Sequence, residues 1–107
     1  MIARIWRGRA KAGDAEHYRR HAIERVFPAL KKFSGHRGAY LLTRCVEGEV
    51  EFLAVTFWES MDAIKSFAGP NPDKAVIEPE ARAVLSDFDD FVRHYEIVDA
   101  PDAFPAS

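Results

Sequence analysis

The most informative stretch of the sequence is residues 49–67, EVEFLAVTFWESMDAIKSF, in which a predicted strand passes directly into a predicted helix. Its first half alternates, and the side chains on both faces of the strand are apolar: Val50, Phe52, Ala54, Thr56 and Trp58 on one, Leu53, Val55 and Phe57 on the other. A strand with two apolar faces is expected to be central in its sheet. Helices would then cover one face of the sheet, and something else would cover the other face. Ser60 is the predicted N-cap of the helix that follows.

Composition indicates an ordinary globular domain. The chain has 107 residues, of which 48% are hydrophobic and 30% charged, with a net charge of −2. These values favour one domain and give no field that would attract nucleic acid or an anionic membrane, so neither partner is expected. The start of the chain has neither the basic leader nor the apolar core of a secretion signal, and we expect a cytoplasmic protein. The single cysteine, Cys45, cannot form an internal disulfide.

The residues before the central strand predict a strand, a long helix and a second strand. Alternation over residues 2–9 indicates the first strand, which contains Trp6. Asp14 is a plausible N-cap for a helix reaching Phe33, and Pro28 inside it predicts a kink or a restart. Residues 39–46 form the second predicted strand, which a tight turn at residues 47–48 joins to the central strand.

After the central helix, the sequence predicts a stiff loop, more helix and a last strand. Residues 68–73 contain two prolines, and residues 74–88 are expected to be helical in two pieces, the second beginning at Pro79. Alternation over residues 91–98 indicates the last strand. Residues 99–107 are expected to form a C-terminal arm, with Phe104 docking on a neighbour.

This order, strand, helix, strand, strand, helix, strand, predicts one ferredoxin-like βαββαβ domain of the α+β class, residues 1–98, with an antiparallel sheet. Right-handed crossovers then place the third strand between the first and second. Helices would cover one face only. The other face, with a share of Trp6, Tyr40, Phe52 or Phe57 and Tyr95, is too apolar to leave in water, which favours a two-fold homodimer through the sheet.

Residues 57–67, FWESMDAIKSF, together with the hairpin 38–58 and the last strand, resemble the antibiotic biosynthesis monooxygenase family of dimeric α+β barrels. The resemblance covers nearly the whole chain from Ile2 to Val98. It implies a homodimer with a small apolar or aromatic ligand. The family includes oxygenases that oxidise phenols or quinols without metal or flavin, enzymes that degrade heme, and members with no known reaction.

Heme degradation is the less favoured branch. Its members use an asparagine in the first strand, a tryptophan after the Trp-Glu-Ser-like motif and a heme-ligating histidine about ten residues later. Trp6, Phe67 and Ile77 fall at about those positions here, so the three functional side chains are missing.

The favoured interpretation is a cofactor-independent monooxygenase acting on a phenol, quinol or anthrone-like molecule. Trp6, Tyr40, Trp58 and Phe67 are the predicted walls of its substrate pocket, and His94 is the candidate proton acceptor. No cofactor is expected. The alternatives left open are a non-catalytic binding protein with the same cavity and a purely structural dimer, in which these aromatic residues are core and His94 is hydrogen-bonded within the sheet.

Other charged groups have simpler interpretations. Arg4 and Arg44 could bind an anionic group of a substrate, but pairing with Glu49, Glu51 or Glu96 across the strands is favoured. His17, His21 and Glu24 share one side of the first helix in a pattern that could bind a metal ion. Because this side lies opposite the apolar stripe of that helix, we expect it to face water, and no metal site is predicted.

Overall fold

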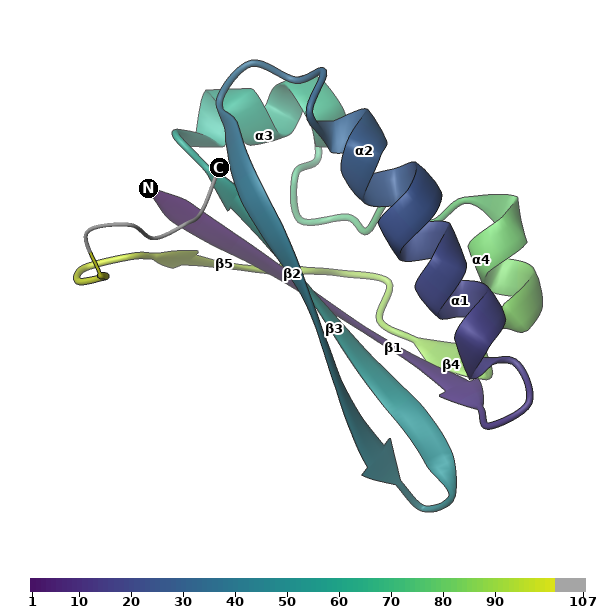
Figure 1. Cartoon of the computed structure of the whole chain (residues 1–107). Helices are drawn as coiled ribbons and strands as arrows, with labels where there is room; N and C mark the ends of the chain where they lie inside the picture. The colour runs from purple at the N-terminus through teal and green to yellow at the C-terminus, as the bar shows by residue number, and fades with distance from the viewer. Residues whose placement is uncertain (102–107) are drawn as a thin grey trace.

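The computed structural model describes residues 1–101, which form an antiparallel five-stranded sheet with all helices on one face (Figure 1). The elements, in chain order, are β1 (Ile2–Lys11), α1 (Ala15–His21), a π-helical turn η1 (Ala22–Val26), α2 (Phe27–Leu30), β2 (His36–Val46), β3 (Glu49–Trp58), α3 (Met61–Ala68), α4 (Pro79–Val84), β4 (Asp87–Phe88) and β5 (Arg93–Glu96). None of the helices in these residues is long and apolar enough to cross a membrane.

The sheet has the predicted topology. Its order is β2-β3-β1, and the free edge of β1 pairs with β4 near Gly8 and with β5 near Arg4. β3 therefore lies between β1 and β2, as its two apolar faces predicted. The β2–β3 hairpin turns through Glu47 and Gly48, both with positive φ of 51° and 78°, the conformation that a tight two-residue hairpin requires. The ferredoxin-like α+β fold is confirmed.

The long helix restarts near Pro28. α1 runs into the π-helical turn η1, and α2 begins again with Pro28 in its first turn, where the missing N–H costs nothing. Asp14 occupies the N-cap position of α1, but its side chain makes no capping hydrogen bond. At α3 the predicted cap is confirmed, since Ser60 Oγ accepts a hydrogen bond from Ala63 N at 3.1 Å.

Of the two helical pieces predicted over residues 74–88, only the second is present, and it begins at Pro79 as predicted. Only Pro79–Val84 is helical, while Lys74 forms a bridge to Phe91 and residues 87–88 form β4. The reason is the open edge of β1: Arg9 O accepts from Ser86 N at 2.8 Å, and Arg7 O accepts from Asp89 N at 3.0 Å. Backbone pairing with this edge therefore outweighs the local helical preference of the last residues.

The C-terminal prediction is only partly covered by the described residues. The last strand is shorter than expected, because β5 includes only Arg93–Glu96. Phe104, whose docking was predicted, lies outside the described residues.

Two core clusters lie between the helices and the sheet. One gathers beneath α1 and α4, with Ala10, Tyr18, Ala22, Phe52 and Ala81. The other gathers beneath α3, with Leu30, Trp58 and Ile64. Because the two clusters are separate, the space between them on this face is not filled by fully buried side chains.

The face of the sheet away from the helices has an apolar part and a charged part. In the apolar part the side chains of Tyr40, Leu42 and Tyr95 are 42–53% exposed. In the charged part Arg44 Nε donates to Glu51 Oε1 at 2.7 Å, which is one of the predicted cross-strand pairs, and Arg7 pairs with Asp87 at 2.8 Å. Trp6 and Phe52 lie on the helix face, so the apolar covering predicted for the outer face comes from Tyr40, Phe57, Tyr95 and their neighbours.

Candidate ligand-binding site

A cavity of about 80 Å³, partly open to solvent, lies between the two core clusters on the helix face of the sheet. Its floor comes from β1 and β3, its roof from the α1–α2 helix, and its rim from residues 76–78. Most of the lining is apolar or aromatic: Trp6, Tyr18, Val26, Phe27, Leu30, Ala54, Phe67, Val76, Ile77, Ala81 and Val92. The polar lining residues are Arg4, His21, Thr56 and Glu78.

Arg4 is the cation of this cavity. The residue is 5% exposed and stands on β1 opposite Thr56, with its guanidinium 5.6 Å from the centre of the Phe67 ring. It donates hydrogen bonds to the carbonyls of Pro72 and of Lys74, the latter at 3.1 Å. Burial lowers the pKa of Arg4 to about 10, which leaves it charged at neutral pH.

The predicted pairing of Arg4 with a carboxylate across the strands was wrong. Within residues 1–101 no carboxylate forms an ion pair with Arg4, whose partners are two carbonyls and an imidazole. The register explains this, because Arg4 faces His94 on β5 and Thr56 on β3. A buried cation with only neutral hydrogen-bond partners is a favourable site for an anion.

His94 supports Arg4 and does not line the cavity. Its Nε2 lies 3.0 Å from Arg4 Nη1, and its Nδ1 lies 3.2 Å from Asp73 Oδ1. Burial and then the charge of Arg4 lower the pKa of His94, while Asp73 acts in the opposite direction. The neutral ring therefore accepts from Arg4 and donates from Nδ1 to Asp73, so both of its nitrogens are engaged.

Two of the four predicted aromatic walls, Trp6 and Phe67, line the cavity. Trp58 is fully buried behind Phe67, stacked on it with ring centres 5.5 Å apart, and its Nε1 donates to Thr56 Oγ1 at 2.9 Å. Tyr40 lies on the opposite face of the sheet, because it pairs with Val55 and not with an inward-facing residue of β3. The predicted pocket position of Tyr40 is therefore corrected.

Trp6 owes its position to Gly8. The outer edge of the indole's six-membered ring reaches over Gly8 on the same face of β1, and a Cβ at Gly8 would come within 2.3 Å of the ring. Trp6 Nε1 also donates to Asp89 O at 2.9 Å, which fixes the other edge of the indole. The glycine thus allows a large aromatic side chain to form one wall of the cavity.

His21 is the residue that the sequence interpretation placed wrongly. It was expected to face water, yet its side chain is only 9% exposed, because the ring turns toward Tyr18 and the cavity and lies near Glu80 of α4. The available signal was its spacing of three residues from the buried Tyr18, which places both on neighbouring parts of one helix face. Glu78, on the cavity rim, gave no comparable signal.

An antiparallel ferredoxin-like sheet covered by helices on one face places the protein among the small α+β proteins. Within this class, the chain belongs to the antibiotic biosynthesis monooxygenase family, whose sequence profile matches residues 1–72. No curated protein matches the sequence significantly.

Solved structures agree with this fold. A protein assigned to the antibiotic biosynthesis monooxygenases from Deinococcus radiodurans is 16% identical, with a TM-score of 0.66 over 95% of this chain and 97% of that one. The heme degrader MhuD from Mycobacterium tuberculosis is 23% identical, with a TM-score of 0.65 over 94% and 99%. A third, assigned to the same monooxygenases and from Bacillus cereus, is 19% identical, with a TM-score of 0.65 over 97% of each chain.

Proposed function

We propose that this protein is a cofactor-independent monooxygenase that binds a small phenol, quinol or anthrone as its anion, with the oxygen of that anion against Arg4. The observation that carries the proposal is a buried guanidinium that, within residues 1–101, forms no ion pair with a carboxylate, at a cavity whose lining is mostly apolar. Apolar walls favour an aromatic ring, and the guanidinium favours a negative oxygen on it.

The proposed oxidation requires few groups besides the guanidinium and the apolar walls. Loss of a proton converts the substrate into an electron-rich anion, which gives electrons to O₂; one oxygen atom enters the substrate and the other leaves as water. Arg4 stabilises the anion and so makes the proton easier to remove. His94 is the proton acceptor that the sequence suggested. It lies behind Arg4 and outside the cavity lining, so its Nε2 would reach the substrate only if Arg4 turned from it toward the substrate.

The size of the cavity limits the substrate. A cavity of about 150 Å³ is known to hold benzene, and the 80 Å³ found here is smaller, so a ring enters only when the rim moves. Val76 on this rim is 51% exposed and has few contacts to lose. We therefore favour substrates with one to three fused rings that displace the 76–78 segment.

Heme degradation receives less support. One of the similar structures is a heme degrader, but Trp6, Phe67 and Ile77, which stand at about the positions of the family's functional residues, offer no iron ligand. All three nevertheless line the cavity, so the same space is used with a different chemistry.

A non-catalytic binding protein is the second candidate, and one observation favours it. Both nitrogens of His94 are already engaged, by Arg4 and by Asp73, which leaves the predicted base without a free lone pair in this state.

For either function we propose a homodimer formed through the apolar part of the outer sheet face, and we keep the cytoplasm as the expected location.

Oxygen uptake by purified protein with a panel of phenols, quinols and anthrones, with metal and flavin excluded, tests the proposal. Arg4→Met should abolish uptake and binding, Arg4→Lys should retain part of both, and Arg19→Met, an exposed arginine on α1, should change neither. Quenching of tryptophan fluorescence reports binding separately, because Trp6 lines the cavity. Binding that depends on Arg4 without uptake identifies a binding protein; uptake unaffected by Arg4→Met refutes the proposed site.

A further inference from the structure

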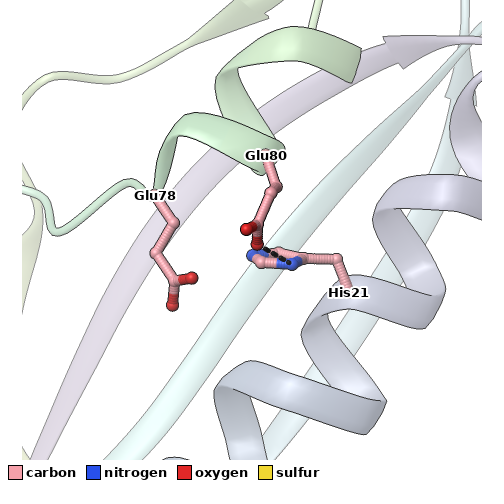
Figure 2. A group of neighbouring side chains, drawn as sticks. All are labelled: His21, Glu78 and Glu80. Carbon is pink, nitrogen blue, oxygen red and sulfur yellow. Dashed lines mark ion pairs between the residues drawn. The ribbon is translucent and has the colours of Figure 1, made fainter.

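We propose that His21, Glu78 and Glu80 form a binding site for a divalent transition-metal ion at the mouth of the cavity. Potential ligand atoms of the three side chains lie within 4.8 Å of one another. Figure 2 shows the imidazole of His21, projecting from the α1 helix, directly below the carboxylate of Glu80, with Glu78 beside them at the segment that leads into α4. This proposal is independent of the oxygenase proposal.

The fold brings these residues together from distant parts of the sequence. His21 is the last residue of α1, Glu78 is the N-cap residue of α4, and Glu80 lies in the first turn of that helix. α4 packs against α1 through Ala81, which belongs to the same core cluster as Tyr18. The separation of the two helices is therefore fixed by buried side chains, which holds the imidazole near the carboxylates.

The burial of the His21 ring and the missing hydrogen bond at one of its nitrogens are the observations that point to a ligand. The side chain is 9% exposed, and within residues 1–101 its Nε2 is buried without a hydrogen-bond partner. Its Nδ1 lies 3.6 Å from Glu80 Oε2, too far for a hydrogen bond. A buried polar atom without a partner is unfavourable, and a metal ion bound at Nε2 would remove this cost.

The ligand set indicates which ions fit. One imidazole and two carboxylates suit Zn²⁺, Mn²⁺ or Fe²⁺ better than Ca²⁺ or Mg²⁺, which prefer oxygen alone. Bonds of about 2.0–2.2 Å place tetrahedral ligand atoms roughly 3.4 Å apart. The potential ligand atoms lie within 4.8 Å of one another, so the carboxylates must close by up to about 1.4 Å. They can do so, because Glu78 is exposed and the side chain of Glu80 is 63% exposed, while the buried ring of His21 stays in place.

The position of the cluster gives an ion a role beyond structure. His21 and Glu78 line the cavity, and His21 and Glu80 line a neighbouring open cleft of about 310 Å³, so the ion would stand between the two. Three protein ligands leave at least one coordination position for water or for an oxygen of a bound molecule. Arg20 and Arg25 also line the cleft, and their positive charges limit the affinity for a cation.

Isothermal titration of the full chain with ZnCl₂, and separately with MnCl₂, tests the site. We expect one saturable site per chain, weakened by about tenfold or more in Glu80→Gln and Glu78→Gln, which change exposed side chains and leave the fold intact. His21→Gln should abolish binding, and its circular dichroism must match the wild type for that result to count.

The matched controls are His17→Gln and Glu24→Gln, which alter exposed residues of the same ligand types that line the same cleft but lie outside the cluster. Both should bind as the wild type does. Absence of a saturable site for both ions overturns the proposal, as does equal weakening by His17→Gln and Glu80→Gln, which would mean that Zn²⁺ binds along the outer face of the helix instead.

Discussion

Arg4 Nη1 and His94 Nε2 lie 3.0 Å apart across the adjacent strands β1 and β5. Since a guanidinium only donates, His94 must accept at Nε2 and carry its proton on Nδ1, where Asp73 lies 3.2 Å away. A buried cation is thereby connected through a neutral imidazole to an exposed carboxylate. Protonation of His94 would break this arrangement, because the ring would then turn a donor toward Arg4.

The stability of the protein should therefore fall below pH 6.5. The folded-state pKa of His94 lies below its ordinary value of 6.5, so the unfolded chain binds the proton first as the pH decreases. The stabilisation is complete above pH 6.5 and is lost as the pH falls through the lowered pKa. His36, whose pKa burial also lowers, contributes in the same direction. Thermal unfolding between pH 7.5 and 5 measures the effect.

In the same series, the Tm of His94→Gln should decrease less on acidification than the Tm of the wild type. His17→Gln, which changes an exposed side chain, is the control and should show the same decrease as the wild type. The pH range stays above 4.5, the ordinary pKa of Glu51, whose lowered folded-state value affects stability only at more acidic pH. Equal pH dependence in wild type and His94→Gln would contradict the assignment of a neutral, buried His94.

Gly8→Ala should destabilise the protein by about 1–3 kcal/mol, because the new methyl group collides with the Trp6 indole and pushes it into the cavity. Urea unfolding measures the loss, and a shift of the tryptophan emission reports the displaced ring. Gly13→Ala is the control, since a Cβ there meets nothing within 4 Å. Equal stability of the two variants would show that Trp6 is not held over Gly8.

Phe67→Ala should cost about 2 kcal/mol, less than the 3–5 kcal/mol typical of a fully buried aromatic residue such as Trp58. Phe67 is only partly buried and faces the cavity, although it stacks on Trp58. Chemical unfolding of Phe67→Ala and Trp58→Ala side by side gives the comparison. A cost for Phe67 equal to that for Trp58 would mark it as packed core and would favour the structural dimer over a ligand-binding cavity.

Leu42→Glu should weaken the proposed homodimer by about tenfold or more, because it places a charge in the apolar part of the outer sheet face. The side chain of Leu42 is 49% exposed. Thr43→Glu, the next residue, points to the helix face and is the control. Sedimentation velocity over a concentration series measures the assembly; a wild-type monomer at all concentrations would refute the dimer.

The sequence predicted the fold well because its signals were local. Alternation on two faces placed β3 in the centre of the sheet, and Ser60 marked the start of α3. The prediction failed on either side of α4: the helix begins at Pro79 as predicted, but residues 87–88, expected to be helical, pair with the open edge of β1 as β4. That outcome depends on a strand more than seventy residues away, which local spacing cannot report.

The candidate site was less predictable, since it depends on strand register and on helix rotation. Trp6 and Phe67 line the cavity, whereas Tyr40 pairs with Val55 and faces away from it. Arg4 was considered as an anion-binding group but was expected to pair with a glutamate. The side chain of His21 was expected to be exposed to water. It is covered by α4, and the sequence did not reveal how the segment around α4 is placed.

The π-helical turn Ala22–Val26 divides the roof of the cavity into two rigid halves. Tyr18 and His21 belong to the half before the turn, while Phe27 and Leu30 belong to the half after it, and each half is anchored in its own core cluster. Turns of this kind interrupt the regular hydrogen-bond ladder and bend more easily than an α-helix. We therefore expect the turn to act as a hinge, through which the cavity would widen for a ring while both anchors stay in place.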